Sequence, residues 1–111
     1  MKTKTNEQII ISLLNIIKER KHVSLDESYT AQLLDNPNLL AKKIGEESSE
    51  LIIDLINKNK TGIISESADL LYHLLVSWVA SGIEPEEIWN ELSKRTFKSG
   101  LEEKKNRKKD E

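Results

Sequence analysis

Helix-breaking residues are few in this chain of 111 residues, and they lie mostly between segments of helical periodicity. Only two prolines and four glycines occur. Inside a helix, proline costs about 3 kcal/mol and glycine about 1 kcal/mol relative to alanine, so their scarcity leaves long stretches free to be helical. No segment shows the sustained alternation of apolar and polar residues that is typical of a strand. The sequence therefore predicts an all-α fold of four to five helices.

The helix boundaries follow from capping signals. Thr5 and Gln8 are placed as a capping box, and Asn36-Pro37 combines a cap residue with proline at the first helical position. Gly62 is expected to mark the break between the second and third long helices. The expected helical segments, in chain order, cover about residues 5–21, 28–34, 36–59, 63–81 and 85–96.

Length and composition narrow the class of protein. The chain fits one domain, expected at residues 1–98, followed by a charged tail at 99–111. With 17 basic and 19 acidic residues, it is not predicted to bind nucleic acid. The lack of cysteine excludes disulfides, thiolate nucleophiles and cysteine-type zinc sites. Neither a signal peptide nor a membrane-spanning run is evident, so we expect a cytoplasmic protein.

Four acidic residues form two short repeats, Glu47-x-x-Glu50 and Glu66-x-x-Asp69, within the second and third long helices. Residues three apart lie on one face of a helix. Two such helices packed together would direct four carboxylates at one point, and like charges that close are costly without cations. Oxygen ligands without sulfur are typical of magnesium or manganese rather than zinc. The repeats therefore predict a magnesium site, and magnesium usually accompanies phosphates.

The second long helix carries an apolar stripe next to an acidic arc. The stripe, expected to face the core, consists of Leu40, Ile44, Leu51 and Leu55. The arc consists of Glu46, Glu47, Glu50 and Asp54, with Lys43 among them. Because the acids border the core stripe, they are placed to lie at a seam between two helices.

The third long helix is apolar on nearly all sides, so we expect it to be buried, partly by a second subunit in a homodimer. One narrow stripe stays polar or small: Glu66, Asp69, His73, Ser77 and Ala80. Buried acids either pair with basic residues, here lysines of a neighbouring helix, or hold a cation. The residues alone leave both alternatives open. We expect His73 to be a hydrogen-bonded structural residue rather than a ligand.

Several segments together resemble one enzyme family, the phosphoribosyl-ATP pyrophosphatases of histidine biosynthesis. The bare acid pattern is shared more widely by all-α nucleoside triphosphate pyrophosphohydrolases of the MazG type, and the flanking strings narrow the resemblance. It covers about residues 9–107. The segments that carry it are KIGEESSE at 43–50, ESADLLYHLL at 66–75, Ser28-Tyr29-Thr30, Arg95-Thr96 and SGLEEK at 99–104. Phe97 departs from the family pattern, which often has glycine there, and Ser48-Ser49 replace small apolar residues.

The resemblance implies hydrolysis of 1-(5-phosphoribosyl)-ATP to 1-(5-phosphoribosyl)-AMP and pyrophosphate, the second step of histidine biosynthesis. It also implies nucleotide binding, magnesium dependence, a cytoplasmic location and a dimer with a shared helical bundle. The implied metal ligands are Glu47, Glu50, Glu66 and Asp69. Glu46 or Glu50 would accept a proton from the attacking water. Candidate substrate contacts are Lys43, Lys42, Arg95, Ser28, Tyr29 and Thr30.

Two other functions remain as alternatives. A MazG-like housecleaning enzyme would use the same acids and metal on ordinary or damaged nucleoside triphosphates. A non-catalytic helical interaction protein would use the apolar third helix for binding, and magnesium would not stabilise its fold.

Overall fold

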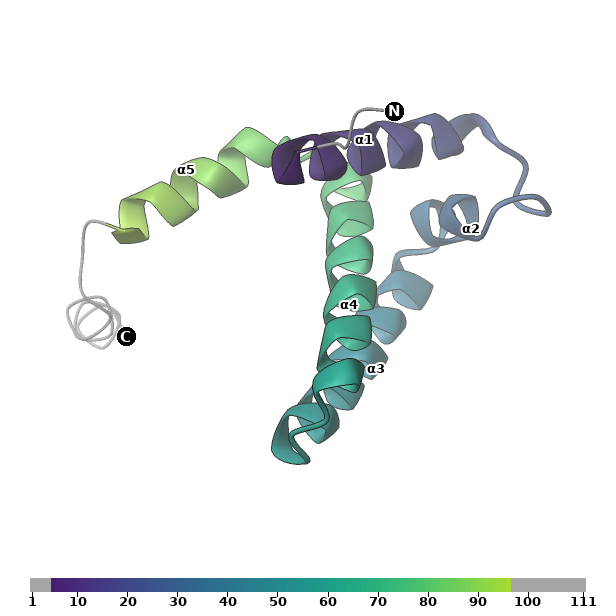
Figure 1. Ribbon diagram of the computed structural model, residues 1–111. Helices are drawn as coiled ribbons and strands as arrows, with labels where there is room; N and C mark the ends of the chain where they lie inside the picture. The colour runs from purple at the N-terminus through teal and green to yellow at the C-terminus, as the bar shows by residue number, and fades with distance from the viewer. Residues whose placement is uncertain (1–4, 97–111) are drawn as a thin grey trace, which may run out of the picture.

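Residues 5–96 are described by the computed structural model of the chain, and they form five α-helices with no β-strand among them (Figure 1). The helices are α1 (Asn6–Glu19), α2 (Tyr29–Asp35), α3 (Pro37–Ile56), α4 (Lys60–Ala80) and α5 (Pro85–Thr96), and a 3₁₀ turn, η1 (Arg20–His22), follows α1. The predicted all-α class is confirmed. None of these helices is long and apolar enough to cross a membrane.

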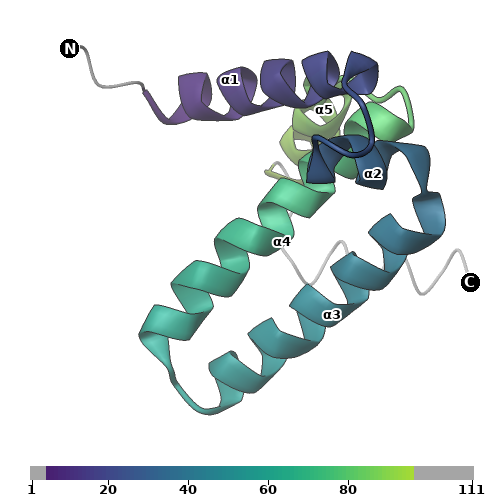
Figure 2. The ribbon, with the colours of Figure 1, turned by 90° about the vertical axis from the view of Figure 1, so that its right-hand side faces the viewer.

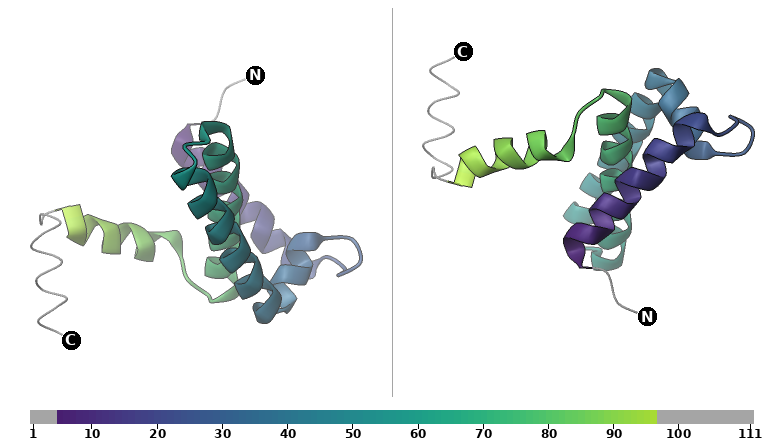
Figure 3. Two further views of the ribbon diagram at one scale, coloured as in Figure 1. Left: turned by 90° about the horizontal axis from the view of Figure 1, so that it is seen from below. Right: turned by 90° about the horizontal axis from the view of Figure 1, so that it is seen from above.

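α3 and α4 lie side by side in opposite directions and form a helical hairpin, which Figure 2 shows along its length. α1 and α2 lie at the end of the hairpin where α3 begins and α4 ends. α5 follows α4 and extends away from the hairpin, as both views of Figure 3 show. The opposite end of the hairpin, at the turn from α3 to α4, therefore projects beyond the other helices.

The hydrophobic core lies at one end of the hairpin. Its residues come from α1, α2, the first turn of α3 and the C-terminal half of α4: Leu14, Ile17, Leu33, Leu40, Leu75, Val76 and Val79. Leu40 is the one buried residue of α3, and the buried residues of α4 begin at His73. The half of the hairpin that carries the acidic repeats thus has no buried core of its own within the single chain.

The predicted caps are confirmed. The Thr5 hydroxyl accepts a hydrogen bond from the Gln8 N–H (3.2 Å), and the Gln8 side chain accepts one from the Thr5 N–H (2.8 Å). The Asn36 side chain accepts from the Leu39 N–H (3.1 Å), with Pro37 at the first helical position. These bonds satisfy N–H groups that have no partner inside the helix, so the start of the acid-bearing α3 is set locally.

The prediction that Gly62 breaks the helix is wrong. Residues 57–59 separate α3 from α4, and Gly62 lies in the first turn of α4. The Asn59 side chain caps that turn by accepting from the Gly62 N–H (3.1 Å), and the Asn59 N–H donates to the carbonyl of Asp54 (2.9 Å). A Cβ atom on Gly62 would lie 2.6 Å from the Asp54 carboxyl group. The glycine allows a close approach of the two helices rather than ending one of them.

The prediction that Leu55 faces the core is also wrong. Leu55 is 61% exposed in the single chain, while Leu51 is half-buried. The reason is the position of the core, because α3 runs beyond α1 and α2 before it reaches Leu55. Ile64 and Leu71 on α4 are exposed as well, so the single chain does not bury this helix on most of its sides as the sequence predicts.

Several expectations concern residues outside the described range. The turn around Phe97, the domain boundary at residue 98 and the charged tail at 99–111 all fall there.

Replacing the cap of α4 tests the hairpin turn. The change Asn59→Ala removes the hydrogen bond to Gly62 and should lower the free energy of unfolding by about 1 kcal/mol, measured by urea denaturation. Asn57→Ala is the matched control, because Asn57 is exposed with right-handed backbone angles. Equal effects of the two changes would contradict the capping role.

Candidate metal centre

The middle of the α3–α4 hairpin brings three predicted ligands together. Glu47 comes from α3, and Glu66 and Asp69 come from α4. Each offers one carboxylate oxygen, and these three oxygens lie within 4.8 Å of one another. The antiparallel pairing of the two helices thus produces the convergence that the acidic repeats predicted. Three oxygen donors at this separation are suited to a hard divalent cation.

Two oxygen atoms of this group are buried without a hydrogen-bond partner, Glu47 Oε2 and Glu66 Oε2. A buried polar atom without a partner loses its hydration and gains nothing in return, which is unfavourable. The ion pairs found within residues 5–96 leave Glu47, Glu66 and Asp69 unpaired, so the lysine alternative is not seen there. A cation between the carboxylates would satisfy both buried oxygens, so the residues present fit a metal ion.

The electrostatics of the group point the same way. Three effects together raise the pKa of Glu66 to about 7. The contact with Glu47 contributes most, followed by desolvation and then by Glu50. Two ionised carboxylates cannot donate to each other, so this contact becomes a hydrogen bond only when one of them carries a proton. Without a cation, Glu66 is therefore about half protonated near pH 7, where an ordinary glutamate is ionised.

The fourth predicted ligand, Glu50, lies one turn after Glu47 and is exposed. Its charge and hydrogen bonding affect Glu66, which places its carboxylate beside the three converging acids. Glu46 pairs with Lys43 (3.4 Å) and, more weakly, with Lys42 (4.0 Å). Within the acidic arc of α3, Glu47 thus converges with the acids of α4, whereas Glu46 is paired with lysines.

The start of α2 lies next to this site. The Ser28 hydroxyl is used as the cap of α2, where it accepts from the Ala31 N–H (3.1 Å). Burial raises the pKa of Tyr29, the positive charge of Lys43 opposes that shift, and the charge of Glu47 adds to it. Because these charges act on the Tyr29 hydroxyl, α2 presents this side chain toward the acid-bearing face of α3.

Two hydrogen bonds fasten α2 to α4. The Thr30 hydroxyl bonds to the Tyr72 hydroxyl, and the Tyr29 hydroxyl lies 3.0 Å from His73 Nε2. His73 is buried and hydrogen-bonded on both ring nitrogens, which confirms the expected structural role. Sequence reasoning assigned no role to Tyr72, although its position three residues after Asp69 places it on the same side of α4.

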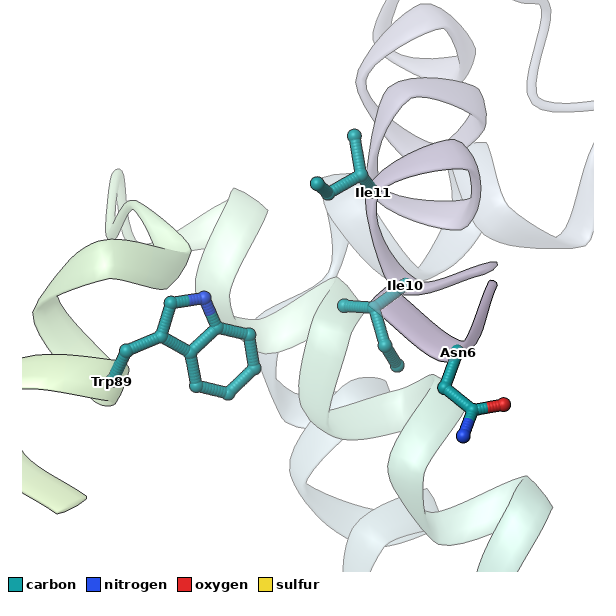
Figure 4. A pocket seen from close by; sticks show the side chains of 4 residues that line it. All are labelled: Asn6, Ile10, Ile11 and Trp89. Carbon is teal, nitrogen blue, oxygen red and sulfur yellow. The ribbon is translucent and has the colours of Figure 1, made fainter. Parts of the chain in front are cut away.

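The remaining candidate, Arg95, is not brought to the acids. It lies on α5, which extends away from the hairpin, and its guanidinium group is 3.5 Å from the Glu91 carboxylate. An open cavity of about 520 Å³ lies between α1 and α5, lined by Asn6, Ile10, Ile11 and Trp89 (Figure 4). Among the side chains that the structure describes, none that lines this cavity is acidic or basic, so these residues do not offer the chemistry of the carboxylate site.

Comparison with known proteins agrees with this geometry. The family described as phosphoribosyl-ATP pyrophosphohydrolase matches residues 11–96. A protein of Paramagnetospirillum magneticum named phosphoribosyl-ATP pyrophosphatase is 42% identical over 94% of this chain and 96% of its own length. A protein of the same name from Azospirillum brasilense is 39% identical over 95% of this chain and 96% of its own length. Another from Methylobacterium nodulans is 45% identical over 86% of this chain and 90% of its own length. The chain therefore belongs to the phosphoribosyl-ATP pyrophosphohydrolase family.

Proposed function

We propose that this protein hydrolyses 1-(5-phosphoribosyl)-ATP to 1-(5-phosphoribosyl)-AMP and pyrophosphate in histidine biosynthesis. The observation that carries the proposal is the convergence of Glu47, Glu66 and Asp69, with two buried oxygens lacking partners, in a chain of this family. The substrate and both products are highly charged and do not cross a bilayer unaided. We therefore place the reaction in the cytoplasm.

Magnesium is the cation that we assign to the site, with manganese as its closest chemical substitute. Glu47, Glu66 and Asp69 would hold it, and Glu50 lies beside them. When bound, magnesium would offset the negative charge of the triphosphate and of the departing pyrophosphate. The four acids are otherwise repulsive toward a polyphosphate, so they favour this substrate only together with cations.

The residues of the chain supply positioning and proton transfer. A water oxygen forms a bond to the α-phosphorus, the bond from that phosphorus to the bridging oxygen breaks, and pyrophosphate leaves with that oxygen. Glu50, exposed beside the converging acids, would accept the proton of the water, and Glu46 is the second candidate. Lys43 would contact a phosphate, and its charge, which acts on both Glu46 and the Tyr29 hydroxyl, supports this role.

Replacing one ligand tests the activity. Asp69→Asn keeps the shape of the side chain but removes a charged donor from the site, and we expect kcat/KM for phosphoribosyl-ATP with magnesium to fall by at least about 100-fold. Pyrophosphate release measures it. Glu19→Gln is the matched control, because Glu19 is exposed at the end of α1. Activity of Asp69→Asn close to that of the wild type would refute the site.

The choice of substrate separates the two enzyme classes. We expect pyrophosphate release from phosphoribosyl-ATP and little from dUTP or dCTP under the same conditions. The reverse preference would favour a housecleaning nucleoside triphosphate pyrophosphohydrolase. A protein that magnesium and a triphosphate do not stabilise in a melting scan would support the non-catalytic alternative.

Protons and magnesium should compete at Glu66. Its pKa is about 7 in the metal-free fold against an ordinary value of 4.5, so the folded state binds this proton more tightly than the unfolded chain. The resulting stabilisation is present below the ordinary value and is lost as the pH rises through 7. We expect Glu66→Gln to reduce the drop in melting temperature of the metal-free protein between about pH 5.5 and about pH 8.

Magnesium should reverse this trend in the wild type. It requires the ionised carboxylate, so its stabilising effect should be larger at about pH 8 than at about pH 5.5. Differential scanning fluorimetry with and without magnesium measures both effects. Identical pH profiles for the wild type and Glu66→Gln would show that Glu66 does not carry the proton.

A homodimer is the assembly that we propose for the chain. Large apolar side chains of α3 and α4 are exposed in the single chain: Ile52, Ile53, Leu55, Ile56, Ile64, Leu71 and Leu74. Clusters of this kind mark interaction surfaces. A second copy of the hairpin, related by a two-fold axis, would cover them and complete a four-helix bundle around the acids.

A charged side chain on this surface tests the dimer. Ile53 is 57% exposed in the single chain, so Ile53→Lys should leave the fold of the subunit intact while placing a charge in the subunit interface. We expect sedimentation to show a dimer for the wild type and a shift toward monomer for the variant. Leu25→Lys, which changes an exposed residue away from the hairpin, should remain dimeric. A monomeric wild type would rule the assembly out.

A further inference from the structure

His73 holds the Tyr29 hydroxyl in one orientation. The imidazole is 5% exposed and lies edge-to-face against the rings of Tyr29 and Tyr72, with centroids 6.1 and 5.3 Å away. Its Nδ1 lies 2.7 Å from the carbonyl oxygen of Asp69, and its Nε2 lies 3.0 Å from the Tyr29 hydroxyl. Both ring nitrogens are therefore engaged, and the ring has no freedom to turn over.

These contacts determine where the protons lie. A carbonyl oxygen only accepts hydrogen bonds, so Nδ1 of His73 must carry the hydrogen that reaches Asp69. A neutral imidazole has a single N–H, which leaves a lone pair on Nε2. The Tyr29 hydroxyl, which has one hydrogen, must then donate it to His73.

Toward the metal centre, the Tyr29 hydroxyl can therefore only accept hydrogen bonds. With its hydrogen directed at His73, the hydroxyl oxygen offers only lone pairs to anything else. Tyr29 is half-exposed, and its hydroxyl lies within reach of the charges of Lys43 and Glu47. A ligand in the site therefore finds an acceptor at Tyr29. Phosphate oxygens are acceptors too, so they are poor partners for it.

We propose that the Tyr29 hydroxyl accepts a hydrogen bond from a sugar hydroxyl of the bound nucleotide, and that His73 is the positioning residue that enforces this polarity. The proposal rests on the proposed function, because it names the part of the phosphoribosylated substrate that meets α2. It narrows the sequence-based expectation for Tyr29, which named this residue only as a candidate substrate contact. The recognition is of a hydroxyl donor, which an inorganic polyphosphate lacks.

Tyr29→Phe is the first test, because it removes the acceptor and keeps the ring. We expect KM for phosphoribosyl-ATP to rise by about three- to tenfold with kcat nearly unchanged. Inhibition by inorganic triphosphate with magnesium should stay as in the wild type, since this ligand carries no hydroxyl donor. The stabilisation by magnesium alone should also be unchanged.

Tyr72→Phe is the matched control. It removes the other hydrogen bond between α2 and α4, the one to Thr30, and leaves the Tyr29–His73 pair intact. We expect a lower melting temperature and an unchanged KM. If Tyr72→Phe raised KM as much as Tyr29→Phe, the effect would lie in the docking of α2, and the proposal would be overturned.

A double-mutant cycle tests the role of His73. His73→Phe keeps an aromatic ring between the two tyrosines but frees the Tyr29 hydroxyl. It should raise KM in the wild-type background and add no further increase in the Tyr29→Phe background. Equal increases in both backgrounds would show that His73 acts only on the fold, and this would overturn its positioning role.

The remaining outcomes are decisive as well. Weaker inhibition by triphosphate in Tyr29→Phe would mean that the Tyr29 hydroxyl donates a hydrogen bond to a phosphate. Weaker stabilisation of this variant by magnesium alone would mean that the Tyr29 hydroxyl accepts its hydrogen bond from a water held with the cation. Either result overturns the sugar assignment, as does an unchanged KM. A wild-type protein inactive on phosphoribosyl-ATP would refute the proposed function instead, so the two failures are distinguishable.

Discussion

Negative charges that repel one another are held side by side by the pairing of α3 with α4. The two helices approach closely where Gly62 meets Asp54, and the turn between them is closed by the cap at Asn59. The three converging carboxylates and their two oxygens without partners follow from this approach. In the metal-free fold the repulsion is relieved by a proton on Glu66, whose pKa is about 7. The hairpin thus holds a concentrated negative charge that a bound cation would neutralise.

Much of this arrangement was predictable because it depends on local chemistry. The caps at Thr5 and Asn36 need only a side-chain oxygen next to free N–H groups, and the convergence of Glu47 with Glu66 and Asp69 needs only two helices with acids three residues apart. Glycine scarcity likewise indicated the all-α class. Features of this kind can be read from a few neighbouring residues.

Other features depend on how distant segments meet, and sequence reasoning did not find them. The sequence predicts a helix break at Gly62, whereas its lack of a side chain makes room for Asp54 on the facing helix. Leu55 fits the helical periodicity of a core stripe, yet the elements that form the core do not reach it. The bond between Tyr29 and His73 joins residues 44 positions apart, so no local pattern reveals it.

The separation of the core from the acids has a consequence for how the molecule opens. Stability is uneven within a fold, and segments with few buried contacts open locally at lower free energy than the core. Leu14, Ile17 and Val76 lie in the core end, whereas the acids lie on the half of the hairpin that lacks one. In the single chain, the half of the hairpin that carries the acids is therefore expected to open first. We expect its amide hydrogens to exchange with solvent ahead of those in α1, and a bound ligand to slow that exchange.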